Sequence, residues 1–175
     1  MNSNKNNVNK NNKNNKDVNS NNMNKNNVND GNIIIYTDGS CSNNIGGLGY
    51  VVIHNNNEYE LFAKVPVAPC TNQIAELYAI YSAIYYVITK FNNFKDITIY
   101  TDSKYSMGCL TRWYPAWQKN GWINSKGESV ANKELIQAII QLSVRLKIKY
   151  FHVKAHNNHK YNDMADRLAN DGRKL

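Results

Sequence analysis

The stretch Ile33-Ile34-Ile35-Tyr36-Thr37-Asp38-Gly39-Ser40 decides how this chain is interpreted, because it places a carboxylate at the end of an apolar run. Three β-branched residues followed by a tyrosine predict a buried β-strand. A carboxylate beside such a strand is costly unless a cation or a hydrogen-bond donor pairs with it. Asp-Gly is also a common turn dipeptide, so this stretch alone leaves a turn and a functional site both open.

A second stretch, Ile97-Thr98-Ile99-Tyr100-Thr101-Asp102-Ser103, repeats the pattern. Two strands that deliver an aspartate at the same relative position indicate one shared site. Two further carboxylates are candidates for it: Glu76, expected in the first turn of a helix, and Asp166, expected one turn inside the last helix. For Glu76 taken alone, attraction to the positive end of the helix dipole is the alternative, and for Asp163 that interpretation is favoured.

The order of the predicted elements indicates a mixed α/β domain with one central sheet covered by helices. Apolar residues at helical spacing predict a long helix from Gln73 to about Phe91, with Thr71 or Asn72 as its N-cap. Gly46-Gly47-Leu48-Gly49 is expected to form a flexible turn, and it leads into a strand, which argues against a phosphate-binding loop. The other expected elements are strands at 33–40, 50–54, 58–65, 97–100 and 148–153, a turn at 55–57, and helices starting at 102–103, spanning 131–145, and running from a cap at Asn162 or Asp163 to Ala169.

Residues 1–30 differ in composition from the rest of the chain. They hold 16 Asn, 5 Lys and 2 Asp, without an aromatic side chain, so they cannot bury enough surface to offset chain entropy. We expect a disordered Asn/Lys-rich tail, followed by one domain over residues 31–175. A targeting signal is the alternative, but neither an apolar signal-peptide core nor an Arg-rich amphipathic pattern is present.

The net charge of the chain is +8, of which the tail carries +3, leaving +5 for residues 31–175. A basic domain favours a polyanionic partner, either nucleic acid or an anionic membrane surface. The sequence has no apolar run long enough to span a bilayer, and we expect no membrane partner. Cys41, Cys70 and Cys109 lack metal-type spacing, which favours reduced thiols in an intracellular protein, nuclear or cytoplasmic.

The segment from Arg112 to Lys126 combines all three tryptophans with cations and contains no acid. Tryptophans four residues apart, at 113 and 117, are also typical of the buried face of a helix, and for Trp117 this is the favoured interpretation. A basic and aromatic protrusion suits a sugar–phosphate backbone, because cations neutralise phosphates and aromatic faces pack on sugars or bases.

Four carboxylates at element ends or in helix turns select a hard divalent cation, Mg²⁺ or Mn²⁺, if they converge. Two such ions about 4 Å apart support in-line displacement at phosphorus. A zinc site built from His152, His156 and His159 is the weaker alternative, since no cysteine or fourth ligand stands nearby. Carboxylates, basic charge and aromatic residues together predict a phosphodiester nuclease.

The chain resembles type 1 ribonuclease H over residues 33–172. Any one of the shared motifs is weak, but four in the same order make a specific signature. They are Tyr36-Thr37-Asp38-Gly39-Ser40, Thr71-Asn72-Gln73-Ile74-Ala75-Glu76-Leu77, Tyr100-Thr101-Asp102-Ser103 and Val153-Lys154-Ala155-His156-Asn157-Asn158-His159 with Asn162 and Asp166-Arg167-Leu168-Ala169.

The resemblance implies a ribonuclease H-like fold, with a five-stranded mixed sheet of three antiparallel strands then two parallel ones, flanked by helices. It implies an endonuclease for the RNA strand of RNA–DNA hybrids that uses two Mg²⁺ ions, with Mn²⁺ as a possible substitute, and leaves 5′-phosphate and 3′-hydroxyl ends. A monomer is expected. The implied metal-binding acids are Asp38, Glu76, Asp102 and Asp166, and His156 matches the histidine assigned to proton transfer or product release.

The resemblance also marks positions that would contact the hybrid. Those in the main body of the domain are Cys41, Asn44, Thr71, Asn72 and Gln73, and those in the protrusion are Trp113, Lys119 and Trp122. RNA would be told from DNA by its 2′-hydroxyl in the wide minor groove.

Several positions depart from the family pattern. Gln73 stands where Asn is usual, and Ile74 stands where Arg is frequent. In the loop that carries His156, Ala155 and Asn158 replace glycines, which affects the mobility of the loop and hence the turnover rate. Gln118 and Asn120 replace basic residues in the protrusion, which predicts weaker and less salt-sensitive binding of the hybrid.

Two other functions are compatible with parts of the sequence. A catalytically silent hybrid-binding module would keep the fold but lose acids, and this chain keeps all four. The ribonuclease H domain of a retroelement polyprotein would follow a polymerase segment, whereas the initial Met and the Asn-rich start resemble a free-standing gene product.

Overall fold

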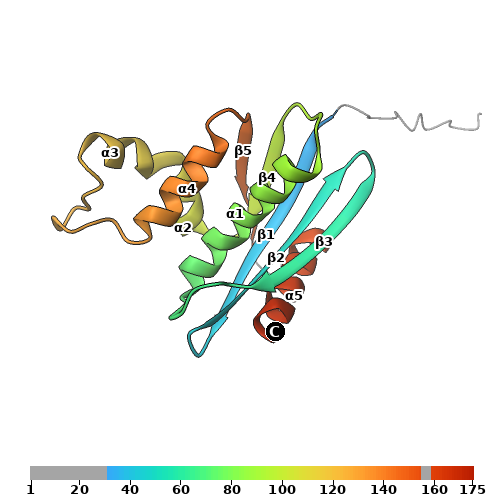
Figure 1. The fold of residues 1–175 in the computed structure, drawn as a ribbon, viewed down its shortest axis with the longest axis horizontal. Helices are drawn as coiled ribbons and strands as arrows, with labels where there is room; N and C mark the ends of the chain where they lie inside the picture. Colours follow the sequence, from blue (N-terminus) through green and yellow to red (C-terminus); the bar gives the residue numbers. More distant parts are fainter. Residues whose placement is uncertain (1–30, 155–158) are drawn as a thin grey trace, which may run out of the picture.

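The structure, a computed structural model, describes residues 31–154 and 159–175. The expected disorder of residues 1–30 and the expected roles of His156, Ala155 and Asn158 lie outside the described residues. Five strands form one mixed sheet in the order β3-β2-β1-β4-β5 (Figure 1). Strands β1 to β3 are antiparallel neighbours, and β1, β4 and β5 run parallel, so the predicted sheet is confirmed. The strands are β1 (Ile33–Ser42), β2 (Ile45–His54), β3 (Asn57–Lys64), β4 (Ile97–Thr101) and β5 (Ile148–His152).

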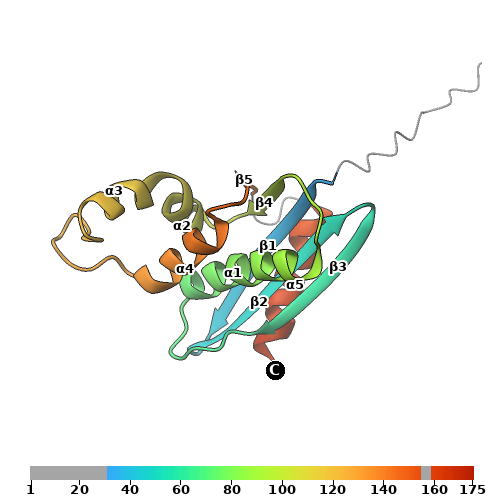
Figure 2. The same cartoon turned by 45° about the horizontal axis from the view of Figure 1, so that its top comes forward.

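Helices lie on both faces of this sheet (Figures 1 and 2). The long helix α1 packs on β1 and β2 from one face, while α5 packs on β1, β2 and β3 from the other. Within the described residues, no helix is long and apolar enough to cross a membrane. The helices are α1 (Asn72–Lys90), α2 (Lys104–Met107), the π-helix η1 (Gly108–Trp113), α3 (Tyr114–Lys119), α4 (Lys133–Ser143) and α5 (Lys160–Arg173).

The main core lies between the sheet and α1. Fully buried isoleucines of β1 and β4 meet the apolar stripe of α1, and α4 adds Ile136 and Ile139 from outside. A smaller cluster on the opposite face joins Tyr36 and Val51 to Ala165 and Leu168 of α5. The two clusters fix both helices against the same strands, which is what brings their acidic residues to β1.

The prediction that Gly46–Gly49 forms a flexible turn was wrong, because these residues belong to β2. The turn lies one step earlier, at Asn43 and Asn44, which both adopt positive φ, a conformation that Asn tolerates better than most residues. A side chain at Gly49 would overlap the α5 backbone at Ala165 and Ala169. Gly47 and Gly49 therefore allow α5 to pack closely on β2 rather than forming a turn.

Replacing Gly49 with Ala should destabilise the protein by about 2 to 4 kcal/mol, because rigid backbone atoms of α5 would have to move. Gly127→Ala is the matched control, since that glycine has open space around it and a positive φ, and should cost only about 1 kcal/mol. Urea unfolding of both variants tests this. Equal losses of stability in the two variants would show that the packing of α5 does not depend on the absence of a side chain at Gly49.

Thr71 is confirmed as the N-cap of α1, because its hydroxyl accepts a hydrogen bond from the Ile74 amide at 3.2 Å. The helix starts at Asn72, so Glu76 lies in the second turn, not the first.

Helix α4 is two residues shorter at each end than predicted, and α5 extends past the predicted Ala169 to Arg173. Helix α5 starts before the predicted caps. Its first residues bind Glu58 of β3, with Lys160 Nζ at 3.1 Å and the Tyr161 hydroxyl at 2.6 Å, so the start of the helix is joined to the sheet.

Candidate active site

The two repeated aspartates meet at the carboxyl ends of neighbouring parallel strands. Thr37 of β1 pairs with Thr101 of β4, which places the following residues, Asp38 and Asp102, side by side. Glu76 joins them from α1. One carboxylate oxygen from each of these three residues lies within 4.8 Å of the other two. The convergence predicted from two similar strand ends is therefore present in the structure.

Glu76 reaches the site because Gly39 lets α1 approach the strand closely. A side chain at Gly39 would overlap the backbone of Ala75 and the amide nitrogen of Glu76. The Asp-Gly dipeptide thus does not end the strand, which continues to Ser42. The glycine makes room for the helix that carries the third acid.

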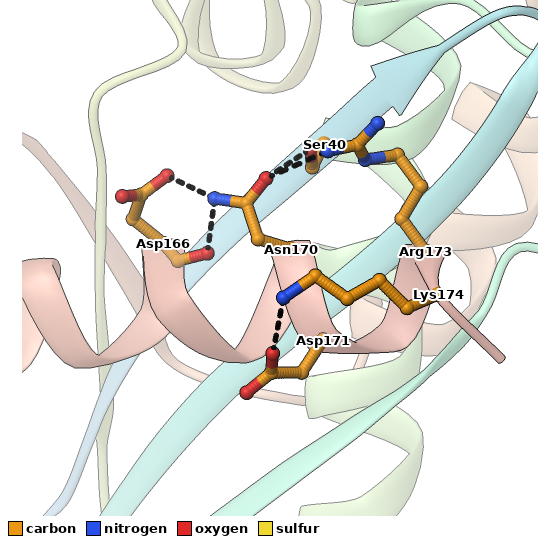
Figure 3. Close-up of polar contacts among 6 residues, drawn as sticks. All are labelled: Ser40, Asp166, Asn170, Asp171, Arg173 and Lys174. Atoms are coloured by element: carbon orange, nitrogen blue, oxygen red, sulfur yellow. Dashed lines mark hydrogen bonds and ion pairs between the residues drawn. The ribbon is translucent and has the colours of Figure 1, made fainter.

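Asp166 approaches the same place from α5 on the other face of the sheet. Its carboxyl group acts on Asp38 by charge repulsion and through a hydrogen bond between the two side chains. Asn170, one turn further along α5, donates from Nδ2 to an Asp166 carboxylate oxygen at 3.1 Å and accepts from the Ser40 hydroxyl at 2.8 Å (Figure 3). Asn170 therefore ties Asp166 to β1.

Sequence analysis missed the role of Asn170. The available signal was its spacing of four residues from Asp166, which puts both side chains on one helix face. That spacing becomes informative only when the structure shows Ser40 opposite this face.

Asn170→Ala should lower kcat by about tenfold with little change in KM, because Asp166 would lose the donor that orients it. Asp171→Asn is the matched control, since Asp171 pairs with Lys174 on the surface of the same helix (Figure 3). Steady-state cleavage kinetics on an RNA–DNA hybrid, the substrate that the sequence resemblance implies, compare the two. An unchanged kcat in Asn170→Ala would contradict the positioning role.

Burial and repulsion between carboxylates raise the pKa of two of the acids, Asp38 and Glu76. Loss of solvent, followed by the nearby charges of Asp102 and Asp166, raises the pKa of Asp38 to about 8. Burial and the charge of Asp38 hold the pKa of Glu76 well above its usual range. Without a counter-charge, the cluster therefore retains protons at neutral pH.

The cluster fits a hard divalent cation. Its donors are all carboxylate oxygens, and one of them, Glu76 Oε2, is buried without a hydrogen-bond partner. A bound cation would satisfy this atom and relieve the repulsion that raises the pKa values. Among the described residues, the one group with suitable geometry contains these three acids, while the zinc alternative includes His156, which lies outside the described residues.

The predicted contact residues of the main body gather beside Glu76. Thr71, Asn72 and Gln73 are exposed at the start of α1. Asn44, in the β1–β2 turn, holds this start in place, because its carbonyl accepts from the Cys70 amide at 3.0 Å. Cys41 contributes through its thiol, which lies 2.9 Å from the Cys70 carbonyl. The β1–β2 turn at Asn44 and the start of α1 at residues 71–73 together form one exposed rim next to the acids.

The protrusion places its aromatic residues unequally. Trp113 is 37% exposed, with the Arg112 guanidinium 5.7 Å from its ring centroid, and Lys119 is exposed. Trp122 is only 8% exposed and packs on Trp117. Trp117 is half-buried and packs against the core, as favoured for it from the sequence. The burial of Trp122 leaves little of its ring for a ligand, so it supports the protrusion from within.

The family model described as RNase H matches residues 30–174. The chain belongs to the ribonuclease H family. Ribonuclease H from Syntrophomonas wolfei is 38% identical over 140 residues, which cover 78% of this chain and 92% of that protein. Ribonuclease H1 from Mus musculus is 34% identical over 148 residues, covering 82% of this chain and 50% of the mouse protein.

Among solved structures, LC9-RNase H1, a type 1 RNase H with the type 2 active-site motif, superposes with a TM-score of 0.71 and 24% identity. The match covers 82% of this chain and 72% of that one, and it shows a shared fold. Family membership makes the chain an enzyme of the ribonuclease H class, a metal-binding hydrolase of nucleic acid.

Proposed function

We propose that residues 31–175 form a catalytic domain that cuts the RNA strand of RNA–DNA hybrids internally and leaves 5′-phosphate and 3′-hydroxyl ends. The observation that carries the proposal is the convergence of Asp38, Glu76 and Asp102, with carboxylate oxygens within 4.8 Å, in a chain of the ribonuclease H family. The basic charge of the whole chain, +8, suits a polyanionic substrate.

The four acids would hold two Mg²⁺ ions, with Mn²⁺ able to replace them. Such ions supply activation of the attacking water and stabilisation of the leaving oxygen. The protein's own residues keep the carboxylates in place. Gly39 leaves room for α1, the β1–β4 register aligns the two aspartates, and Asn170 orients Asp166. These contacts hold the acids at fixed positions before substrate arrives.

The rim formed by Asn44 and by Thr71, Asn72 and Gln73 is placed to read the hybrid next to the acids. Its amide and hydroxyl groups can hydrogen-bond to 2′-hydroxyls across the wide minor groove, which is how RNA would be distinguished from DNA. Trp113 and Lys119 of the protrusion would contact a more distant part of the backbone. His156 is proposed to act in proton transfer or product release.

The test is cleavage of four end-labelled substrates, an RNA–DNA hybrid, an RNA duplex, a DNA duplex and single-stranded RNA, in Mg²⁺, Mn²⁺ or EDTA. We expect metal-dependent cutting of the hybrid's RNA strand alone, with ligatable 5′-phosphate ends. Cutting of the RNA duplex at the same rate would contradict hybrid specificity. Tight binding of the hybrid without cutting in either metal would indicate a silent module instead.

A further inference from the structure

The sheet face that carries Asp38 and Asp102 also carries a row of aromatic rings. Tyr36 of β1, Tyr100 of β4 and Phe151 of β5 are register partners across three neighbouring strands. Tyr36 and Tyr100 stack with centroids 4.8 Å apart and planes at 11°, and Tyr100 and Phe151 follow at 5.5 Å and 25°. The three rings therefore form a continuous stack that leads to the edge of the sheet.

One end of this stack is fixed and the other is open. Tyr36 is buried, and His159 and Tyr161 pack against it. Helix α5 covers β1, β2 and β3 (Figures 1 and 2), and Phe151 lies on the edge strand β5 with 47% of its surface exposed. An apolar ring in this position can accept a further planar group as the next member of the stack.

Two lysines lie close to Phe151 along the chain. Residues 135–162 contain no Asp or Glu, and they include Lys149, two residues before Phe151 on the same sheet face, and Lys154, just after β5. Both lysines are exposed. In the described part of the chain, the ion pairs join Glu58, Glu60 and Asp171 to cations of α5 and its C-cap, and neither of these two lysines takes part.

A planar, apolar stacking surface beside cations complements a single-stranded nucleic acid, whose bases have free faces and whose phosphates are negative. A duplex fits less well, because its bases already stack on one another. Tyr100, the middle ring of the stack, precedes Asp102 by two residues, which is about 7 Å along a strand, so the stack lies next to the acids.

We propose that the open end of the stack at Phe151, supported by Tyr100 behind it, binds an unpaired nucleic-acid strand that extends from the hybrid at the active site, with Lys149 and Lys154 beside its phosphates. This inference rests on the proposed function only for the source of the strand. It adds a binding site outside the rim and the protrusion, and it predicts that substrates with single-stranded extensions are held more tightly than blunt ones.

The direct test is binding of fluorescent single-stranded RNA and DNA 12-mers to the full chain in EDTA, measured by anisotropy. Phe151→Ser should weaken binding by about tenfold, since each base–aromatic stack contributes on the order of a tenfold gain in affinity. Phe151→Trp should restore binding. Lys149→Ser should weaken binding and reduce its dependence on salt.

Phe62→Ser is the matched control, because Phe62 is 45% exposed on β3, the opposite edge of the sheet. It should bind the 12-mers like the unchanged protein, and thermal melting would establish that both Ser variants are folded. Equal binding by Phe151→Ser and the unchanged protein, or equal losses in Phe151→Ser and Phe62→Ser, would overturn the proposal.

A second measurement compares cleavage of a blunt hybrid with that of the same hybrid carrying an eight-nucleotide single-stranded extension. The extension should raise kcat/KM several-fold in the unchanged protein and in Phe62→Ser, but not in Phe151→Ser, while blunt cleavage stays the same in all three. Failure to cut either hybrid would contradict the proposed function and leave the anisotropy test valid. Efficient cutting without any effect of the extension would contradict the extension site alone.

Discussion

Asp38→Asn is expected to abolish cleavage and, at the same time, to stabilise the metal-free protein. The side chain keeps its shape but loses the negative charge that a divalent cation needs, so cleavage should fall by on the order of a thousandfold or more. Asp38 is only 7% exposed and is repelled by Asp102 and Asp166. Removing its charge should raise the free energy of unfolding by about 1 to 3 kcal/mol.

The measurement combines hybrid cleavage in Mg²⁺ with urea unfolding in EDTA at pH 8.5, where the unchanged Asp38 carries its charge for most of the time. Glu60→Gln is the matched control, because it removes a carboxylate from an exposed ion pair with Arg167, and such pairs contribute about 0 to 1 kcal/mol. It should leave cleavage unchanged. An Asp38→Asn protein that is inactive and also less stable would show that Asp38 holds the fold together, contrary to this account.

The stability of the metal-free protein is expected to fall as the pH rises from about 4 to about 8. The pKa of Asp38 is raised from 3.8 in an unfolded chain to about 8 in the folded protein, and that of Glu76 is raised in the same direction. Between these values the folded state binds more protons than the unfolded state, so unfolding releases protons and becomes easier at higher pH. Above about pH 8 the contribution of Asp38 is constant.

Divalent cations should reverse this trend, because they bind the ionised carboxylates and compete with protons. Melting temperatures in EDTA and in 10 mM Mg²⁺, from pH 5 to pH 9, test both statements. We expect Mg²⁺ to raise the melting temperature only slightly at pH 5 and by several degrees at pH 8.5. The contribution of the cluster is the difference between the unchanged protein and Asp38→Asn, whose melting temperature should depend less on pH. Identical pH profiles for the two proteins would contradict the raised pKa values.

The order and type of the elements could be predicted because each depends on local pattern. Alternating or continuous apolar runs fixed the five strands, and the spacing of apolar residues along α1 fixed that helix to within one residue at each end. The same pattern failed at Gly46–Gly49. The local sequence around a glycine does not show whether the residue forms a turn or lies in a strand on which a helix packs closely. At Gly49 the answer depends on α5, which lies more than 100 residues away in the sequence.

The four acids could be proposed from the sequence because each has a recognisable place at a strand end or on a helix, within motifs whose order resembles a family. How they interact was decided by tertiary structure. The raised pKa of Asp38 depends first on its burial and then on the charges of Asp102 and Asp166, and the orientation of Asp166 depends on an Asn170–Ser40 bond that joins residues 130 positions apart. Local sequence encodes which residues carry charge and which elements hold them. The distances between the acids, their burial and their mutual repulsion depend on how separate elements pack together. The stack of Tyr36, Tyr100 and Phe151 depends on packing in the same way, because the three rings come from three different strands.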